Sequence, residues 1–98
     1  MAGSNGDREF CVVSYDVPSD KRRNRVHRVL TGFGEWVQYS VFECHLTKKE
    51  LLMMRSKLDR VLNPEEDRVR IYHMCSACVA KVESIGCEGP RERDVYVV

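Results

Sequence analysis

Two amphipathic helical patterns, each flanked by segments rich in strand-forming residues, predict an α+β fold for this chain of 98 residues. The order is strand, helix, a strand or strand pair, helix, strand, and a late strand. Two helices arranged in this way pack on one face of a mostly antiparallel sheet. We therefore expect a ferredoxin-like β-α-β-β-α-β fold with an additional C-terminal strand. Because this fold hosts nucleases, RNA binders, metal carriers and regulatory modules alike, it does not decide the function.

The composition describes one globular domain whose charge is uneven. Hydrophobic residues make up 43% and charged residues 32%, which excludes a disordered chain. The net charge is only +1, so overall charge does not mark a nucleic-acid binder. Residues 20–28, however, contain five lysines or arginines and one aspartate. Such a local basic patch suits phosphate contact at one face, although a solvated helix face has the same pattern.

The compartment is predicted from what the sequence lacks. It contains no secretory signal and no apolar run long enough to span a bilayer, so we expect a cytoplasmic protein without membrane contact. The five cysteines are then expected to be reduced thiols.

The first half of the chain begins with a polar stretch without periodicity, residues 1–9, which we expect to be a flexible leader before a single domain, residues 10–98. Residues 10–15 are apolar and β-branched, which predicts a buried strand. Asp20 is predicted to cap the first helix. Its apolar stripe is formed by Val26, Val29, Leu30 and Phe33, and Gly32 and Gly34 stop it.

The second half begins with strand formers over residues 36–44. Their alternation breaks near Tyr39 and Ser40, which indicates one long bent strand or two strands joined by a tight turn or bulge. Residues 47–50 (TKKE) predict a capping box and a second helix. Residues 68–74 predict a strand with Val69 and Ile71 on one face, and residues 75–85 one or two helical turns. The apolar segment 94–98 predicts a strand that needs a partner, which we expect to be a second subunit in a homodimer.

Asp16 is the leading candidate for chemistry, because it ends the first strand, where a side chain projects beyond the sheet edge. Mg²⁺ usually takes one or two carboxylates and keeps several waters. Two copies of Asp16 across a dimer axis would make a paired site that holds Mg²⁺ and its activated water against a phosphodiester. The alternative is that Asp16 only caps a turn.

Other polar and aromatic residues have two possible roles each. Arg22, Arg23 and Arg25 are candidate phosphate clamps or a solvated helix surface. Tyr15 and Tyr39 can each stack on a base or position a phosphate, but packing is the alternative for both. Ser40 can donate to a ligand or to the backbone. The pattern Cys75-x-x-Cys78, with His73 and Cys87 nearby, lacks the regular second ligand pair of a zinc site and the βαβ context of a redox motif.

Five segments together resemble one known family, and the resemblance extends from Phe10 to Cys78. The segments are residues 15–17 (YDV), 21–26 (KRRNRV), 30–34 (LTGFG), 37–43 (VQYSVFE) and 70–75 (RIYHMC). They resemble the second CRISPR-associated protein, the Cas2 family. The resemblance implies a ferredoxin-like homodimer whose C-terminal strand adds to the partner's sheet. It also implies assembly with the CRISPR integrase as a bridge for double-stranded DNA, and Mg²⁺-dependent cleavage of single-stranded RNA or double-stranded DNA.

The resemblance also implies roles for individual residues. Asp16 corresponds to the metal-binding aspartate, with Tyr15 beside it in the catalytic site. Arg23, Arg25 and Phe42 also match positions implicated beside it, although core packing is the other role open to Phe42. Together with Arg22, Arg28 and Ser40, which the residue types themselves suggest, they are the residues expected to contact nucleic acid. Trp36 departs from the family pattern, since some members carry an arginine there, and a phosphate-binding charge is thus missing.

Two alternatives to a nuclease remain open from the sequence. One is a structural DNA-binding adaptor of the integrase complex that needs no catalysis. The other is a ferredoxin-like regulatory or toxin-type ribonuclease module unrelated to CRISPR.

Overall fold

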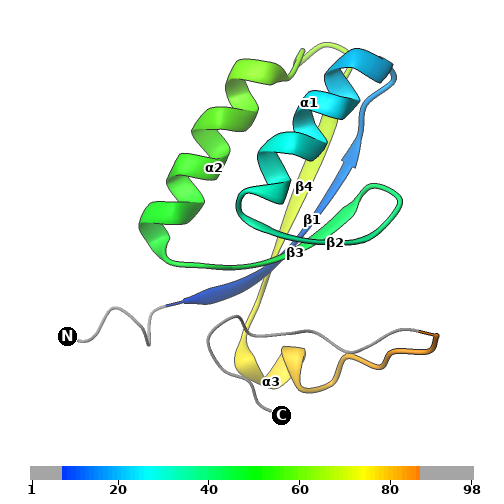
Figure 1. Cartoon of the computed structure of the whole chain (residues 1–98). Helices are drawn as coiled ribbons and strands as arrows, with labels where there is room; N and C mark the ends of the chain where they lie inside the picture. Colours follow the sequence, from blue (N-terminus) through cyan, green and yellow to red (C-terminus); the bar gives the residue numbers. More distant parts are fainter. Residues whose placement is uncertain (1–7, 87–98) are drawn as a thin grey trace.

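The computed structural model describes residues 8–86 and contains one four-stranded sheet with two long helices on one face (Figure 1). The elements are β1 (Glu9–Asp16), α1 (Asp20–Thr31), β2 (Gly34–Gln38), β3 (Val41–Leu46), α2 (Lys48–Val61), β4 (Arg68–Met74) and α3 (Ser76–Val79). The strand order is β2-β3-β1-β4, and every neighbouring pair is antiparallel. This topology confirms the predicted ferredoxin-like fold. The expected strand 94–98 and most of the expected leader lie outside the described residues. Of that leader, Glu9 opens β1, and the Arg8 guanidinium donates to the His45 carbonyl at 3.0 Å.

The core lies between the sheet and the two helices. Alternate residues of β1 and β3 face the helices, as the two-residue period of a strand requires. Val26 and Leu30 of α1 meet them from one helix, and Met54 and Leu58 of α2 from the other. The strand residues in this core are Cys11, Val13, Tyr15, Phe42, Cys44 and Leu46. Val69 and Ile71 pack at its edge, which confirms that they share a face.

The helix starts are set by capping side chains. The prediction that Asp20 caps α1 is wrong, because the cap is Ser19, whose extended backbone lets its hydroxyl accept from the Arg22 N–H at 3.2 Å. Asp20 is the first helical residue, and its carboxylate pairs with Arg23. The capping box of α2 is confirmed, since Thr47 and Glu50 exchange hydrogen bonds of 2.9 and 3.2 Å.

The segment that could be one strand or two is a hairpin of β2 and β3. A bulge lies between Trp36 and Gln38, and Tyr39 at the turn has φ +39°. Gly32 caps the C-terminus of α1 as predicted, whereas Gly34 belongs to β2. A Cβ at Gly34 would collide with β3, so glycine allows the two strands to approach.

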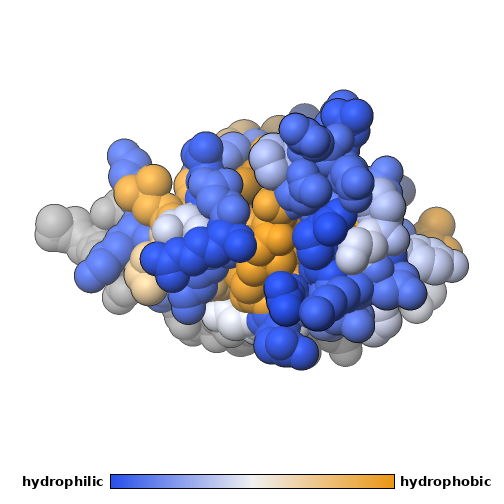
Figure 2. Space-filling view, turned by 90° about the horizontal axis from the view of Figure 1, so that it is seen from above, coloured by the Kyte–Doolittle hydropathy of each residue, from blue (hydrophilic) through white to orange (hydrophobic). Residues whose placement is uncertain are grey.

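The surface is mainly hydrophilic. Seen from above, a strip of hydrophobic surface lies between two hydrophilic borders (Figure 2). Within residues 8–86, none of the helices has the length and apolar character needed to cross a membrane.

Candidate functional site

Asp16 is an exposed carboxylate at the carboxyl end of β1. The strand ends here because Pro18 follows shortly and has no N–H to continue the ladder. In register, Asp16 lies opposite Arg68 of β4. Its carboxylate makes no hydrogen bond or ion pair with any other residue in the range 8–86. Within residues 8–86, the Asp16 carboxylate therefore caps no turn, contrary to the alternative role. Its oxygens are available to a ligand.

Tyr15 precedes Asp16 but points to the other face of the sheet, as successive strand residues do. Its side chain is buried, and its hydroxyl lies 3.5 Å from His27 Nδ1. Burial raises the pKa of the Tyr15 phenol, and a hydrogen bond with the Ser40 side chain and the charge of Arg23 partly oppose this shift. The two predicted catalytic side chains thus do not share one face.

Arg22 is held by an acidic cluster rather than presented to solvent. Its guanidinium donates to Asp67 at 2.8 and 3.0 Å and to Glu66 at 2.8 Å. These bonds hold the pKa of Asp67 below its ordinary value, and Asp67 also accepts from the Asn63 N–H at 2.8 Å. Arg22 therefore ties α1 to the α2–β4 connection, and the prediction that it clamps phosphate does not fit the structure. In sequence the acidic cluster lies more than 40 residues away, and only the fold brings it beside α1.

The remaining arginines divide between two surfaces. Arg23 donates to the Val17 carbonyl at 2.8 Å and pairs with Asp20, so it braces the turn that follows Asp16. Arg25 and Arg28 lie on another side of α1, where they line a groove of about 430 Å³ that Lys57 of α2 also lines. This groove collects three cations over an apolar floor. The single arginine surface expected from the sequence is thus split.

Phe42 is a core residue, and the backbone of Ser40 holds the β2–β3 turn. Phe42 is completely buried, with its ring centroid 5.1 Å from that of His27, so the predicted nucleic-acid contact does not fit and core packing is its role. Its place on β3 opposite the helices explains this, since residues at that parity face the core. The Ser40 carbonyl accepts from the Tyr15 N–H at 3.0 Å, which fastens the β2–β3 turn to the end of β1.

His27 is a contact residue, although its place on the basic helix favours a surface residue from sequence alone. Its ring lies against Phe42 and against Trp36, whose ring centroid is 6.0 Å away. The available signal was its position four residues after Arg23 and three before Leu30, on the edge of the apolar stripe. His27 thereby joins α1 to the β2–β3 hairpin.

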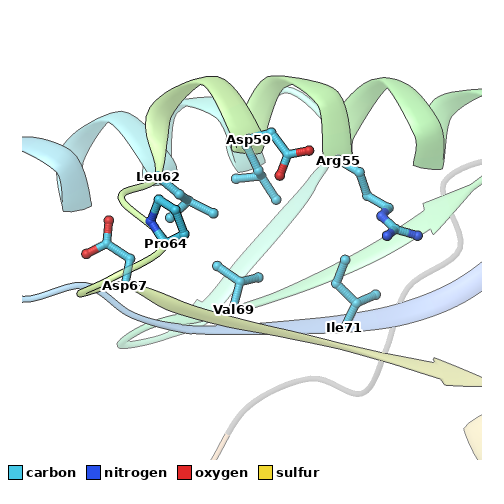
Figure 3. A pocket seen from close by; sticks show the side chains of 8 residues that line it. Arg55, Asp59, Leu62, Pro64, Asp67, Val69 and Ile71 are labelled. Carbon is cyan, nitrogen blue, oxygen red and sulfur yellow. The ribbon is translucent and has the colours of Figure 1, made fainter.

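The other candidate features lie away from this region. Cys75 and Cys78 are exposed, and within residues 8–86 no three His, Cys, Asp or Glu side chains gather closely enough to hold a metal. Cys87 lies outside the described residues. A groove of about 520 Å³ runs between α2 and β4, floored by Val69 and Ile71 (Figure 3). It contains none of the predicted site residues.

Comparison with known proteins decides the family. The family model for CRISPR associated protein Cas2 matches residues 9–82 of the chain. This chain belongs to the Cas2 family. A Cas2 relative from Chloroflexus aurantiacus, named CRISPR-associated endoribonuclease Cas2 1, is 40% identical over 92 residues, which cover 91% of this chain and 99% of the relative. The resemblance predicted from the sequence is confirmed.

Two solved structures share the Cas2 fold of this chain. A hypothetical protein from Thermus thermophilus superposes with a TM-score of 0.74 at 37% identity, covering 85% of this chain and 95% of that one. A chain from a partial Cas6-RT-Cas1–Cas2 complex superposes with a TM-score of 0.74 at 22% identity, covering 92% of this chain and 98% of that one. The second likeness shows the fold alone.

Proposed function

We propose that this chain is a metal-dependent endonuclease of CRISPR adaptation that works as a homodimer, with Asp16 of each protomer at the metal site. The observation that carries the proposal is the exposed Asp16 carboxylate, which has no internal partner among residues 8–86. Family membership supports it, because the Chloroflexus relative is named an endoribonuclease. The substrate is single-stranded RNA or double-stranded DNA.

The residues present fit Mg²⁺ only if two protomers meet. Each protomer contributes the Asp16 carboxylate to this site, and the described residues contain no three-ligand cluster. Mg²⁺ accepts one or two carboxylates and completes its shell with waters, so two copies of Asp16 make a sufficient donor set. When bound there, Mg²⁺ supplies a water activated for attack on a phosphodiester and neutralises charge on the phosphate.

The other residues position the substrate. Arg23 holds the turn after Asp16 through the Val17 carbonyl, and part of its side chain remains exposed. Arg25, Arg28 and Lys57 give the α1–α2 groove a charge that attracts phosphate backbone. Burial raises the pKa of the Tyr15 phenol, and the Tyr15 N–H donates to the Ser40 carbonyl at 3.0 Å. Tyr15 is therefore a positioning residue that anchors the hairpin.

The dimer would also bridge the subunits of the CRISPR integrase during spacer acquisition. The alternative function is a DNA-binding adaptor without catalysis, and a specific observation favours it: the cationic groove lies on α1 and α2, apart from Asp16. Such a surface binds phosphates whether or not Asp16 is intact.

The test compares the wild type with Asp16→Asn and the matched surface variant Asp59→Asn on single-stranded RNA and duplex DNA, with and without Mg²⁺. Asp16→Asn is expected to lose at least about 100-fold in cleavage rate, since it removes a group that organises charge at the reacting phosphate. Asp59→Asn should cleave as the wild type does. Cleavage that persists in Asp16→Asn would identify a contaminant and refute the nuclease. Normal spacer acquisition by a cleavage-dead Asp16→Asn would support the adaptor.

A further inference from the structure

The tip of the β2–β3 hairpin carries two exposed aromatic side chains, which we call the aromatic tip (Trp36 and Tyr39). The exposed fraction is 57% for Trp36 and 88% for Tyr39. Large aromatic residues bury much apolar area when they pack in a core, so two of them exposed on one hairpin indicate a contact surface rather than a packing element.

The aromatic tip is held in a defined conformation. The indole Nε1 of Trp36 donates to the Tyr39 carbonyl at 2.7 Å. The Trp36 ring also meets the His27 ring edge-on, with an interplanar angle of 66°. An indole fixed in this way loses little conformational entropy when a flat ligand stacks on it.

Tyr39 has a backbone conformation that its residue type disfavours. Its φ of +39° lies in the left-handed region, where glycine and asparagine are preferred. Strain of this kind is concentrated at functional sites, where a side chain is retained for what it binds. Packing of the Tyr39 phenol does not offset this strain, since the side chain is almost fully exposed.

The aromatic tip lies next to the proposed nuclease site, and the charge of Arg23 acts on Tyr15 at that site. The Ser40 carbonyl, one residue after Tyr39, accepts from the N–H of Tyr15, the neighbour of Asp16 in β1. Arg23 lies one helical turn from His27, which contacts Trp36. Exposed aromatic faces with a cation in the same region are a pattern by which proteins bind unpaired nucleotides, since the bases stack and the phosphates pair with the cation.

We propose that Trp36 and Tyr39 form a stacking platform for unpaired nucleobases, which selects single strands over duplexes. In a duplex the base faces are already stacked and cannot reach the platform, whereas a single strand exposes them. Base binding at the platform stands by itself. Only its consequence, that the Asp16 site acts on single strands, rests on the proposed function.

The chain provides its own probe, because Trp36 is its only tryptophan. The wild-type protein is titrated with uridine and thymidine oligonucleotides of about 12 nucleotides, and with a duplex of equal length, in EDTA so that no metal-dependent cleavage occurs. Single strands of both kinds should quench the tryptophan fluorescence at saturation, and the duplex should bind without quenching. Duplex quenching equal to that by single strands, or a strict requirement for ribose, would overturn stacking as the basis of recognition.

Affinity of labelled oligonucleotides, measured by anisotropy, tests the two residues separately. Trp36→Ala and Tyr39→Asn should each weaken single-strand binding by about 5- to 150-fold, the range for loss of one stacking aromatic, and change duplex binding little. Asparagine tolerates positive φ, so Tyr39→Asn removes the ring while keeping the turn. Leu52→Ala, an exposed position on α2, is the matched control and should bind as the wild type does.

The charge-for-ring exchange Trp36→Arg gives a second readout. It should lose the preference for single strands and steepen the dependence of log affinity on log salt by about one. Unchanged single-strand affinity in Trp36→Ala and Tyr39→Asn, with both variants folded, would refute the platform. Because these measurements omit the metal, they are independent of whether Asp16 supports cleavage, and a failure of the nuclease would leave them unaffected.

Discussion

Substitution of Phe42 distinguishes most clearly between a side chain that packs in the core and one that contacts nucleic acid. Its ring is completely buried, with ring centroids 6.3 Å from Tyr15 and 5.1 Å from His27. Truncation of a buried phenylalanine to alanine costs about 3–5 kcal/mol through lost burial and the cavity that remains. A domain of this size has about 5–15 kcal/mol in all. Phe42→Ala should therefore lower the melting temperature by about 12–40 °C, at about 4–8 °C per kcal/mol.

The conservative variant Phe42→Leu keeps most of the volume and should cost only about 1–2 kcal/mol, including the lost aromatic contacts. Both variants are measured by denaturant unfolding followed by circular dichroism, at two protein concentrations because a dimer's stability depends on concentration. At a temperature where it is folded, Phe42→Leu should bind oligonucleotides with wild-type affinity. If Phe42→Leu is as stable as the wild type yet loses most of its binding, Phe42 contacts nucleic acid and the packing argument is wrong.

Three further predictions concern caps, close approach and thiols. Ser19→Ala should destabilise the fold by about 1 kcal/mol and Asp20→Ala by clearly less, as measured by unfolding, because Ser19 is the cap; the reverse order would restore the sequence prediction. Gly34→Ala should cost about 1–3 kcal/mol, since its Cβ meets β3, and an unchanged melting temperature would contradict the close approach. Hydrogen bonds from the backbone N–H and the thiol of Cys78 hold the pKa of the Cys75 thiol below its ordinary value of 9.0. The same side-chain hydrogen bond raises the pKa of the Cys78 thiol. Cys75 should therefore gain thiolate at lower pH and react with iodoacetamide before Cys78 in peptide mapping across pH 6–9, and equal rates would contradict this.

Several features of the candidate site were accessible from local sequence because they depend on near neighbours. Asp16 ends a strand since an apolar run stops before Pro18, and the TKKE pattern opens α2 since a threonine and a glutamate three residues apart satisfy each other's backbone. Local sequence does not distinguish Ser19 from Asp20 as the cap of α1. Both residue types cap helices well, so one residue of shift in the turn decides between them.

The role of each charged or aromatic side chain depended on distant contacts. Arg22 is one of five cations in the basic segment, and nothing local sets it apart. Its guanidinium is occupied by Asp67 and Glu66, which the fold places beside it, and so it is not offered to a phosphate. Arg25 and Arg28 remain candidate phosphate contacts, because they line a groove together with Lys57.

By itself the sequence determined the order of elements, the faces that they bury, the family and the place of Asp16, because hydrophobic period and strand ends are local properties of the chain. Only the tertiary structure decided that Phe42 is core while Trp36 and Tyr39 are surface, although all three lie in one strand-forming segment. The physical reason is that exposure depends on what covers a position. β3 is an inner strand that the helices cover, whereas Trp36 lies on the edge strand β2 and Tyr39 in the turn, so one ring is buried and two remain open to a ligand.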